Sequence, residues 1–285
     1  MSPAARFMIG LACLALVGGA FFWGSRHAST PAPPLPSAPV IAPVAPAPPP
    51  PPAPEPAIRH PIEAPSAPRA ALPALDDSDD YLKKALDELL GRKSVLSFVL
   101  VDGLARRFVA TVNNLATDSA TAQMWPVRRT DGRFETEAQA GSSTISARNA
   151  DRYAAFVAFV SSVDTQRAVS LYVRLYPLFQ RAYTDLGFPD KYFNDRVVEV
   201  IDNLLATPEL PEPIKVKLVT VEGAPRPSGA GGLYVFDDPA LEARSSGQKI
   251  LLRMGRANAS KLKAKLTDIR RRIAQGPVAR AAHNQ

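Results

Sequence analysis

Three carboxylates on one predicted helix are the side chains best suited to acid–base chemistry. Asp195, Glu199 and Asp202 follow one another at spacings of four and three residues, so an α-helix places them within roughly 60° of one another. Glycoside cleavage by two carboxylates is the most natural reaction for such a cluster, provided that one carboxylate lies in a cleft with a raised pKa. The alternative is a solvated helix face with surface ion pairs, each contributing about 0 to 1 kcal/mol. The spacing itself does not require catalysis.

A line of cations precedes this acidic line in the sequence. Arg167, Arg174 and Arg181 lie seven residues apart, which places them on one edge of the preceding helix. If the two helices are neighbours, the arginine line could meet the acidic line.

Histidine and cysteine are almost absent, and this excludes several kinds of site. His27, His60 and His283 are the only histidines and Cys13 is the only cysteine, so residues 74–275 contain neither. Zinc sites of the usual ligand types, Ser-His and Cys-His catalysis, thiol redox chemistry and haem ligation through histidine are therefore unsupported. We predict no metal and no cofactor. Any catalysis would have to use Asp, Glu, Lys, Tyr or Ser.

The helices that carry these lines form the densest apolar stretch, residues 171–208. A helix over 164–186 is apolar around more than half of its circumference, which is typical of a central helix. Pro177 predicts a kink or a break near Tyr176, because proline removes a backbone donor. A second helix is predicted from Asn194 or Asp195 to Ala206.

The remaining pattern predicts a mainly α fold with a small β-hairpin, of the α+β class. The Val95–Val101 run is ambiguous between strand and helix, and residues 117–144 show no sustained period, which indicates a long loop pinned by apolar side chains. Alternating apolar residues predict the two strands of the hairpin. One predicted helix ends at Leu90, and further helices are predicted over 104–115, 149–163, 239–255 and 257–275. The two predicted strands cover 214–221 and 233–236.

The first part of the chain has the pattern of a membrane anchor. After a short tail at 1–6, residues 7–23 are uncharged and are bounded by Arg6 and Arg26, a length near the lower limit for a spanning helix. A cleaved signal peptide is the alternative. We favour an uncleaved anchor because bulky aromatic residues prolong the apolar run.

Residues 24–73 have the composition of a disordered linker rich in proline and alanine. Of the 29 prolines in the chain, 18 fall between Pro31 and Pro73, and such a segment favours polyproline II geometry. At about 3.1 Å per residue it could extend on the order of 130 Å. We therefore predict a tether that holds a globular domain, residues 74–275, away from the membrane, followed by a flexible basic tail at 276–285.

Charge is unevenly distributed along the chain. Residues 244–285 hold 11 basic residues and one acidic residue, whereas residues 74–243 hold 19 basic and 24 acidic residues. The basic helix that carries Arg270, Arg271 and Arg272 could face anionic lipid, a polyanion or the acidic part of the same chain. Nucleic acid is not favoured as a partner, because the helix lacks interleaved aromatics and a recognition motif.

Three long stretches carry a family resemblance: RRFVATVNNLA, LYVRLYPLFQRAYTDLGFPDKYFNDRVVEVIDNLLATP and LEARSSGQKILLRMG. Together they resemble a bacterial family known as domain of unknown function 3014. The resemblance extends over the globular part and the plan of an anchor followed by a proline-rich segment. It implies a Gram-negative envelope protein in the inner membrane, and it supplies no catalytic residue.

The leading hypothesis is a non-enzymatic interaction or scaffold module on the periplasmic side of the inner membrane. Its membrane partner is the inner membrane, contacted through residues 7–23, and its other partner is an unknown envelope protein or cell-wall polymer. One alternative is a carboxylate-dependent cell-wall hydrolase. Another is a basic protein that faces the cytoplasm and binds anionic lipid or nucleic acid.

Overall fold

The computed structural model describes residues 58–62, 71–118, 124–139, 142–219 and 233–274. The predicted anchor at 7–23, most of the predicted linker and the tail at 276–285 lie outside these residues. No helix in the described ranges has both the length and the apolar character needed to cross a membrane. The helices are α1 (Asp79–Leu90), α2 (Arg92–Phe98), α3 (Leu104–Leu115), α4 (Arg148–Ser161), α5 (Thr165–Asp185), α6 (Phe193–Leu205), α7 (Pro239–Glu242), α8 (Ser246–Arg253) and α9 (Arg256–Ile273).

Helix α5 is the predicted central helix. It begins at Asp164, whose side chain accepts a hydrogen bond from the backbone N of Arg167 at 2.8 Å. The helix continues through Pro177 and is not broken there. Tyr176 and Leu178 on either side are both buried, so packing compensates for the backbone hydrogen bond that proline removes.

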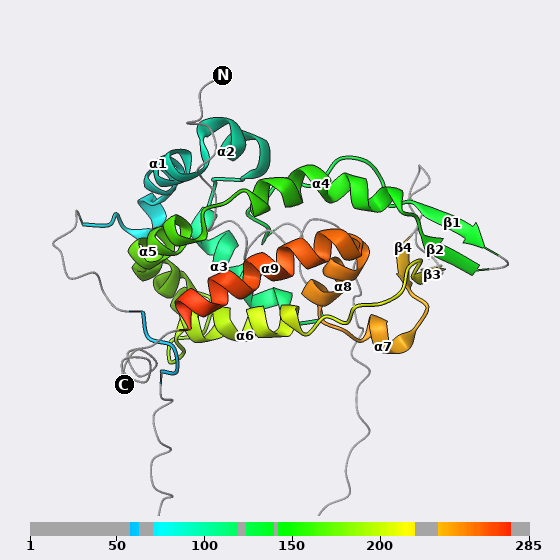
Figure 1. Cartoon of the computed structure of the whole chain (residues 1–285). Helices are drawn as coiled ribbons and strands as arrows, with labels where there is room; N and C mark the ends of the chain where they lie inside the picture. Colours follow the sequence, from blue (N-terminus) through cyan, green and yellow to red (C-terminus); the bar gives the residue numbers. More distant parts are fainter. Residues whose placement is uncertain (1–57, 63–70, 119–123, 140–141, 220–232, 275–285) are drawn as a thin grey trace, which may run out of the picture.

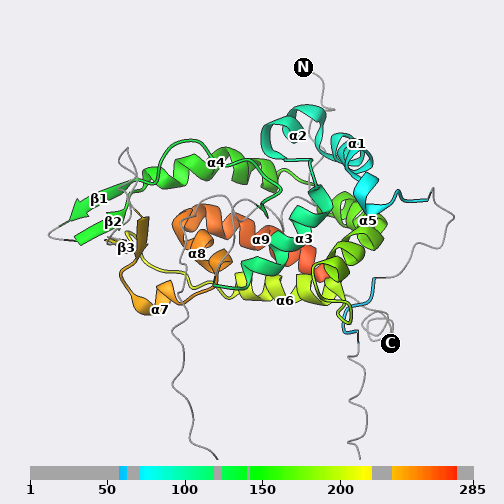
Figure 2. The same cartoon turned by 180° about the vertical axis from the view of Figure 1, so that it is seen from behind.

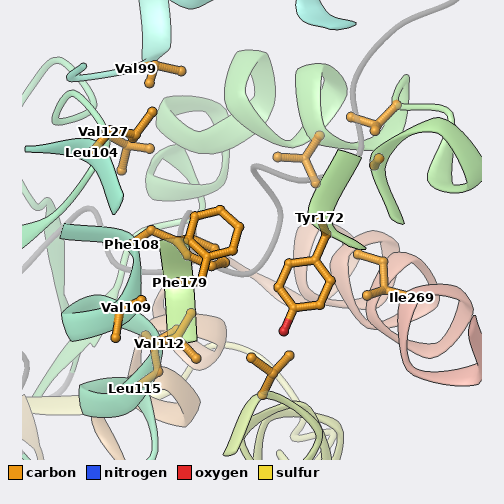
Figure 3. Close-up of a cluster of buried hydrophobic side chains, with 14 of the residues drawn as sticks. Val99, Leu104, Phe108, Val109, Val112, Leu115, Val127, Tyr172, Phe179 and Ile269 are labelled. Carbon is orange, nitrogen blue, oxygen red and sulfur yellow. The ribbon is translucent and has the colours of Figure 1, made fainter. Parts of the chain in front are cut away.

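Helices α3 and α5 meet in the main hydrophobic core, which Figure 3 shows. The rings of Phe108 and Phe179 have centroids 4.8 Å apart, and Phe179 stacks on Tyr172 at 5.8 Å. Ile269 of α9 approaches this group from the other side (Figure 3). Three helices that are distant in sequence are therefore joined by one cluster of buried side chains.

Helix α9 runs lengthwise through the domain, with α4 along one side and α6 along the other (Figures 1 and 2). Its buried residues repeat at three- and four-residue spacing, as predicted. The short helix α8 packs closely against α3 and α6: a Cβ added to Gly247 would lie 2.4 Å from Leu204 Cδ2 and 2.9 Å from the Leu115 carbonyl oxygen. Only glycine fits at this position without displacing a neighbour. The buried residues of α9 are Asn258, Leu262, Leu266, Ile269 and Ile273.

A four-stranded antiparallel sheet lies at the end of the domain opposite α1 and α2 (Figure 1). Its order is β1 (Thr136–Gln139), β2 (Ser142–Ile145), β3 (Lys215–Val219) and β4 (Leu233–Phe236). Strands β3 and β4 confirm the predicted hairpin. The prediction of a loop over 117–144 was wrong for β1 and the start of β2, because these mostly polar strands lack an apolar face. Strand β1 pairs with β2, and β2 in turn pairs with β3.

The mainly α fold with a small β part is thus confirmed, and the sheet is larger than the predicted hairpin. A second, smaller core of Val216, Phe236, Leu241 and Leu252 joins it to α7 and α8. Arg253 is buried beneath β4, with its guanidinium carbon 4.5 Å from the centroid of the Phe236 ring. Burial lowers the pKa of Arg253 to about 10, against the opposing effect of the Glu242 carboxylate.

Candidate functional site

The predicted acidic line is divided among three different partners. Glu199 pairs with Arg196 at 2.6 Å, and Asp202 Oδ2 accepts from Arg270 Nη2 of α9 at 2.9 Å. The side chains of Glu199 and Asp202 are 55% and 46% exposed. Asp195 instead binds backbone amides, as described below. The structure therefore gives each carboxylate a separate partner, and they do not converge on a shared substrate position.

The predicted arginine line does not meet these carboxylates. Arg181 Nε pairs with Asp185 Oδ1 at 3.0 Å on its own helix. Arg174 Nε is buried and has no hydrogen-bond partner within the described ranges. Arg167 contributes its backbone N to the cap of α5. Between the residues described here, no ion pair joins Arg167, Arg174 or Arg181 to the acidic line.

The basic end of α9 faces the chain's own polar side chains. Arg270 pairs with Asp202, Arg271 pairs with Asp268, and Arg272 Nη1 donates to Gln166 Oε1 at 2.7 Å. The hydrogen bond to Asp202 raises the pKa of Arg270. Of these contacts, only the pair of Arg270 with Asp202 joins the basic helix to the acidic part of the chain, because Asp268 lies on α9 itself.

The most complete polar site lies where residues 58–62 cross the start of α6 and the end of α9 (Figures 1 and 2). The backbone N of Arg59 donates to Asp195 Oδ2 at 3.0 Å, and the backbone N of His60 donates to Asp195 Oδ1 at 2.7 Å. One carboxylate therefore binds two consecutive amides. Asp195 also lies in the first turn of α6, where the helix dipole favours a negative charge.

Asn194 is the centre of this site and is completely buried. Its Nδ2 donates to the carbonyl oxygens of His60, at 2.8 Å, and of Ile273, at 3.0 Å. Its Oδ1 accepts from Tyr172 Oη at 3.1 Å. Both N–H groups of the amide donate and its oxygen accepts one bond, so Asn194 joins residues 58–62 to α5 and α9 at once.

Tyrosine hydroxyls complete the site. Tyr192 Oη accepts from the backbone N of Ile62 at 2.7 Å, and Tyr176 Oη accepts from the backbone N of Asn194 at 3.2 Å. Burial raises the pKa of Tyr172 well above its usual range, and burial followed by the neighbouring Tyr172 raises the pKa of Tyr176. Both phenols therefore remain neutral at physiological pH, suited to fixed hydrogen bonds and not to proton transfer.

We call the residues Tyr172, Tyr176, Tyr192, Asn194 and Asp195 the docking site. Of these, sequence reasoning selected only Asp195, and for a different role. Residues 58–62 fall inside the range predicted as a linker, yet the structure describes them in contact with the domain, where His60 Nδ1 also lies 3.2 Å from the Ala274 carbonyl oxygen. The contacts are mainly to backbone atoms, so no side-chain pattern in 58–62 predicts them. The one available signal is a polar Asn-Asp pair in the first turn of α6, where Asn194 is buried.

A hollow of about 380 Å³, open to solvent, lies beside the end of α6 and the start of α9. Its charged groups bind atoms of the chain itself: Glu212 Oε1 accepts from the backbone N of Arg256 at 2.7 Å, and Lys263 donates to the Thr207 carbonyl. These groups are not directed at a common ligand position. Across the ranges that the structure describes, no group of three His, Cys, Asp or Glu residues could hold a metal ion.

Comparison with known proteins identifies the family. No curated protein and no solved structure matches the chain. The sequence model of the family described as "Protein of unknown function (DUF3014)" matches residues 104–270. This range runs from the start of α3 almost to the end of α9, and so includes the docking site and the whole sheet. The chain therefore belongs to the DUF3014 family.

Proposed function

We propose that this protein is a non-enzymatic interaction module of the Gram-negative cell envelope. In this proposal residues 7–23 anchor it in the inner membrane, and the proline-rich segment holds the domain in the periplasm. There it binds an envelope protein or a cell-wall polymer. The length and composition of the proline-rich segment support the tether, and the apolar run flanked by arginines supports the anchor.

The observation that carries the proposal is the set of hydrogen bonds that the Asp195 carboxylate accepts. A general acid or nucleophile needs a carboxylate that faces an open substrate position, whereas both oxygens of Asp195 accept hydrogen bonds from backbone amides. Glu199 and Asp202 are exposed and paired with arginines. The polar groups of the domain thus favour holding a polypeptide over cleaving a substrate.

The test is made in a strain whose growth or envelope integrity depends on the protein. The combined Glu199→Gln and Asp202→Asn variant should retain full function, because each substitution removes only a surface ion pair worth about 0 to 1 kcal/mol. Loss of function with unchanged expression and circular dichroism would overturn the proposal in favour of a carboxylate-dependent hydrolase.

The localisation is tested separately by topology. A reporter that is active only in the periplasm, fused after Gln285, should be active, and a reporter active only in the cytoplasm should be silent. The reverse result would refute the periplasmic location and would make the basic residues from Arg244 to Gln285 the leading functional feature.

A further inference from the structure

The docking site holds residues 58–62 mainly through their backbone. The N–H groups of Arg59 and His60 donate to Asp195, the His60 carbonyl accepts from Asn194, and the N–H of Ile62 donates to Tyr192. Three amides are bonded in all, and Pro61, which has no N–H, lies between the bonded amides of His60 and Ile62. The backbone bends at Arg59 and His60, which brings their two amides to one carboxylate. Such a site recognises a short bent peptide segment with two consecutive amides, a proline and a further amide, mainly through its backbone.

The protein side of the contact is fixed by bonds that do not involve residues 58–62. Asn194 is held by Tyr172 and by the Ile273 carbonyl. Tyr192 packs on Tyr176, with ring centroids 5.2 Å apart. The site therefore keeps its shape when the segment leaves, and a preorganised site binds a ligand at lower entropic cost.

The bound segment, by contrast, has little apolar contact to retain it. Ile58 is 54% exposed, and the backbone of Arg59 is bonded at an exposed position. Ile62 is only partly buried against the core. Backbone hydrogen bonds contribute modestly once lost hydration is counted, so these few bonds hold the segment without locking it in place.

From these observations we infer that the docking site is a peptide-binding site which the chain occupies with its own residues 58–62. The external ligand is a short segment of a partner protein with the same chemistry and the same bent backbone: two consecutive amides, a proline and an aliphatic residue. It binds by displacing residues 58–62. This inference rests on the proposed interaction function and specifies the partner as a polypeptide.

The test compares how tightly a peptide binds two forms of the full chain. One is the unaltered chain, whose docking site holds residues 58–62, and the other is an opened variant, in which these residues are prevented from binding there. The probe is a fluorescent peptide of sequence PAIRHPIEA, residues 56–64. The opened variant carries His60→Pro and Ile62→Pro, which remove two of the bonded N–H groups. We expect it to bind the peptide about tenfold more tightly than the unaltered chain, because occupation in cis reduces the fraction of chains competent to bind.

Two carboxylate variants of the opened chain form a matched pair. Asp195→Ala should lower peptide affinity by about tenfold or more, since it removes a charged acceptor of two hydrogen bonds. Asp202→Ala removes a carboxylate from the same helix that does not touch the segment, and it should leave affinity unchanged. A probe with proline at both substituted positions should not bind the opened chain.

Three results would overturn the inference: no binding to the opened chain, equal binding to the unaltered chain, or binding that is insensitive to Asp195→Ala. If the opened variant is not folded by circular dichroism, hydrogen exchange in the unaltered chain decides the question. Saturating peptide must then accelerate exchange at the amides of Arg59, His60 and Ile62, and unchanged rates refute displacement.

Two further results separate this inference from neighbouring explanations. A concentration-dependent dimer in light scattering that Asp195→Ala abolishes would identify the ligand as the segment of a second copy and would overturn the partner-protein inference. If the unaltered, opened and Asp195→Ala chains recover a partner equally well from envelope extracts, the result supports the proposed function. It refutes the inference that the partner binds at the docking site.

Discussion

The replacement of Asn194 by alanine gives the strongest test of the docking site, because this side chain joins three separate parts of the chain. The variant leaves Tyr172 Oη and the Ile273 carbonyl without a partner in a buried position. Each buried polar group that loses its partner costs about 1 to 3 kcal/mol, so the free energy of unfolding should fall by about 2 to 6 kcal/mol. The carbonyl of His60 is only part-buried and can bind water in compensation. Urea unfolding of the full chain, followed by far-UV circular dichroism, measures the loss.

A double-mutant cycle of Asn194→Ala with Tyr172→Phe tests whether the loss of stability comes from the hydrogen bond between these two side chains. The combined variant removes both partners of one hydrogen bond, so it should cost less than the sum of the two single variants, with a coupling free energy of about 0.5 to 3 kcal/mol. Additive effects, together with a loss below about 1 kcal/mol for Asn194→Ala alone, would refute our account of the site.

Asn258 provides a matched control for this experiment. It is also buried, and its Nδ2 donates to the carbonyls of Ala150 and Met254 at 2.8 and 2.9 Å. Asn258→Ala should lower stability without changing hydrogen exchange at the His60 amide. Asn194→Ala should lower stability and accelerate that exchange. Acceleration of equal size in both variants would mean that exchange reports global unfolding and not release of the segment.

Other parts of the fold give further predictions. Gly247→Ala should lower the free energy of unfolding by about 1 to 3 kcal/mol, since the new Cβ overlaps Leu204; unchanged urea midpoints would contradict the close packing of α8. Arg253→Lys should cost about 0.5 to 2 kcal/mol, because the flat guanidinium over Phe236 is lost, and thermal unfolding checks this value. Burial raises the pKa of Asp268, but hydrogen bonds and nearby arginines outweigh it and hold this pKa below its ordinary value of 3.8. Its contribution to stability is therefore complete above that value and disappears as pH falls through the folded-state pKa. Asp268→Asn should flatten the acid limb of a stability curve measured from about pH 5 downward, and a curve as steep as that of the unaltered chain would contradict this assignment.

Apolar periodicity predicted the helices well because burial on one face imposes it. The predicted range 104–115 matches α3 at both ends, and the alternation around Val216 and Phe236 located the β3–β4 hairpin. Strands β1 and β2 were not predicted because their residues are mostly polar, and because β2 pairs with residues of β3 that lie about 70 positions later in the chain. Of the two outcomes predicted at Pro177, a kink or a break, the structure contradicts the break, since α5 continues through the proline.

The docking site shows where side-chain patterns lose their predictive value. The spacing of Asp195, Glu199 and Asp202 was correctly assigned to one face of a helix, but spacing carries no information about their partners. The partner of Asp195 is a pair of backbone amides 135 and 136 residues earlier in the chain. Every non-proline residue has such an amide, so no residue type marks the ones that bind.

The contact of residues 58–62 with α6 and α9 also determines how the domain responds to mechanical force. Residues 58–62 lie beside the end of α9, since His60 Nδ1 and the Ala274 carbonyl oxygen are 3.2 Å apart. A pull on the preceding chain therefore reaches Asp195 and Asn194 before it reaches α1. Tension is first carried by a few backbone hydrogen bonds at the start of α6, which can part and re-form while the helical core remains folded. In a single-molecule pulling experiment, rupture of the contacts of residues 58–62 should therefore precede unfolding of the helical core.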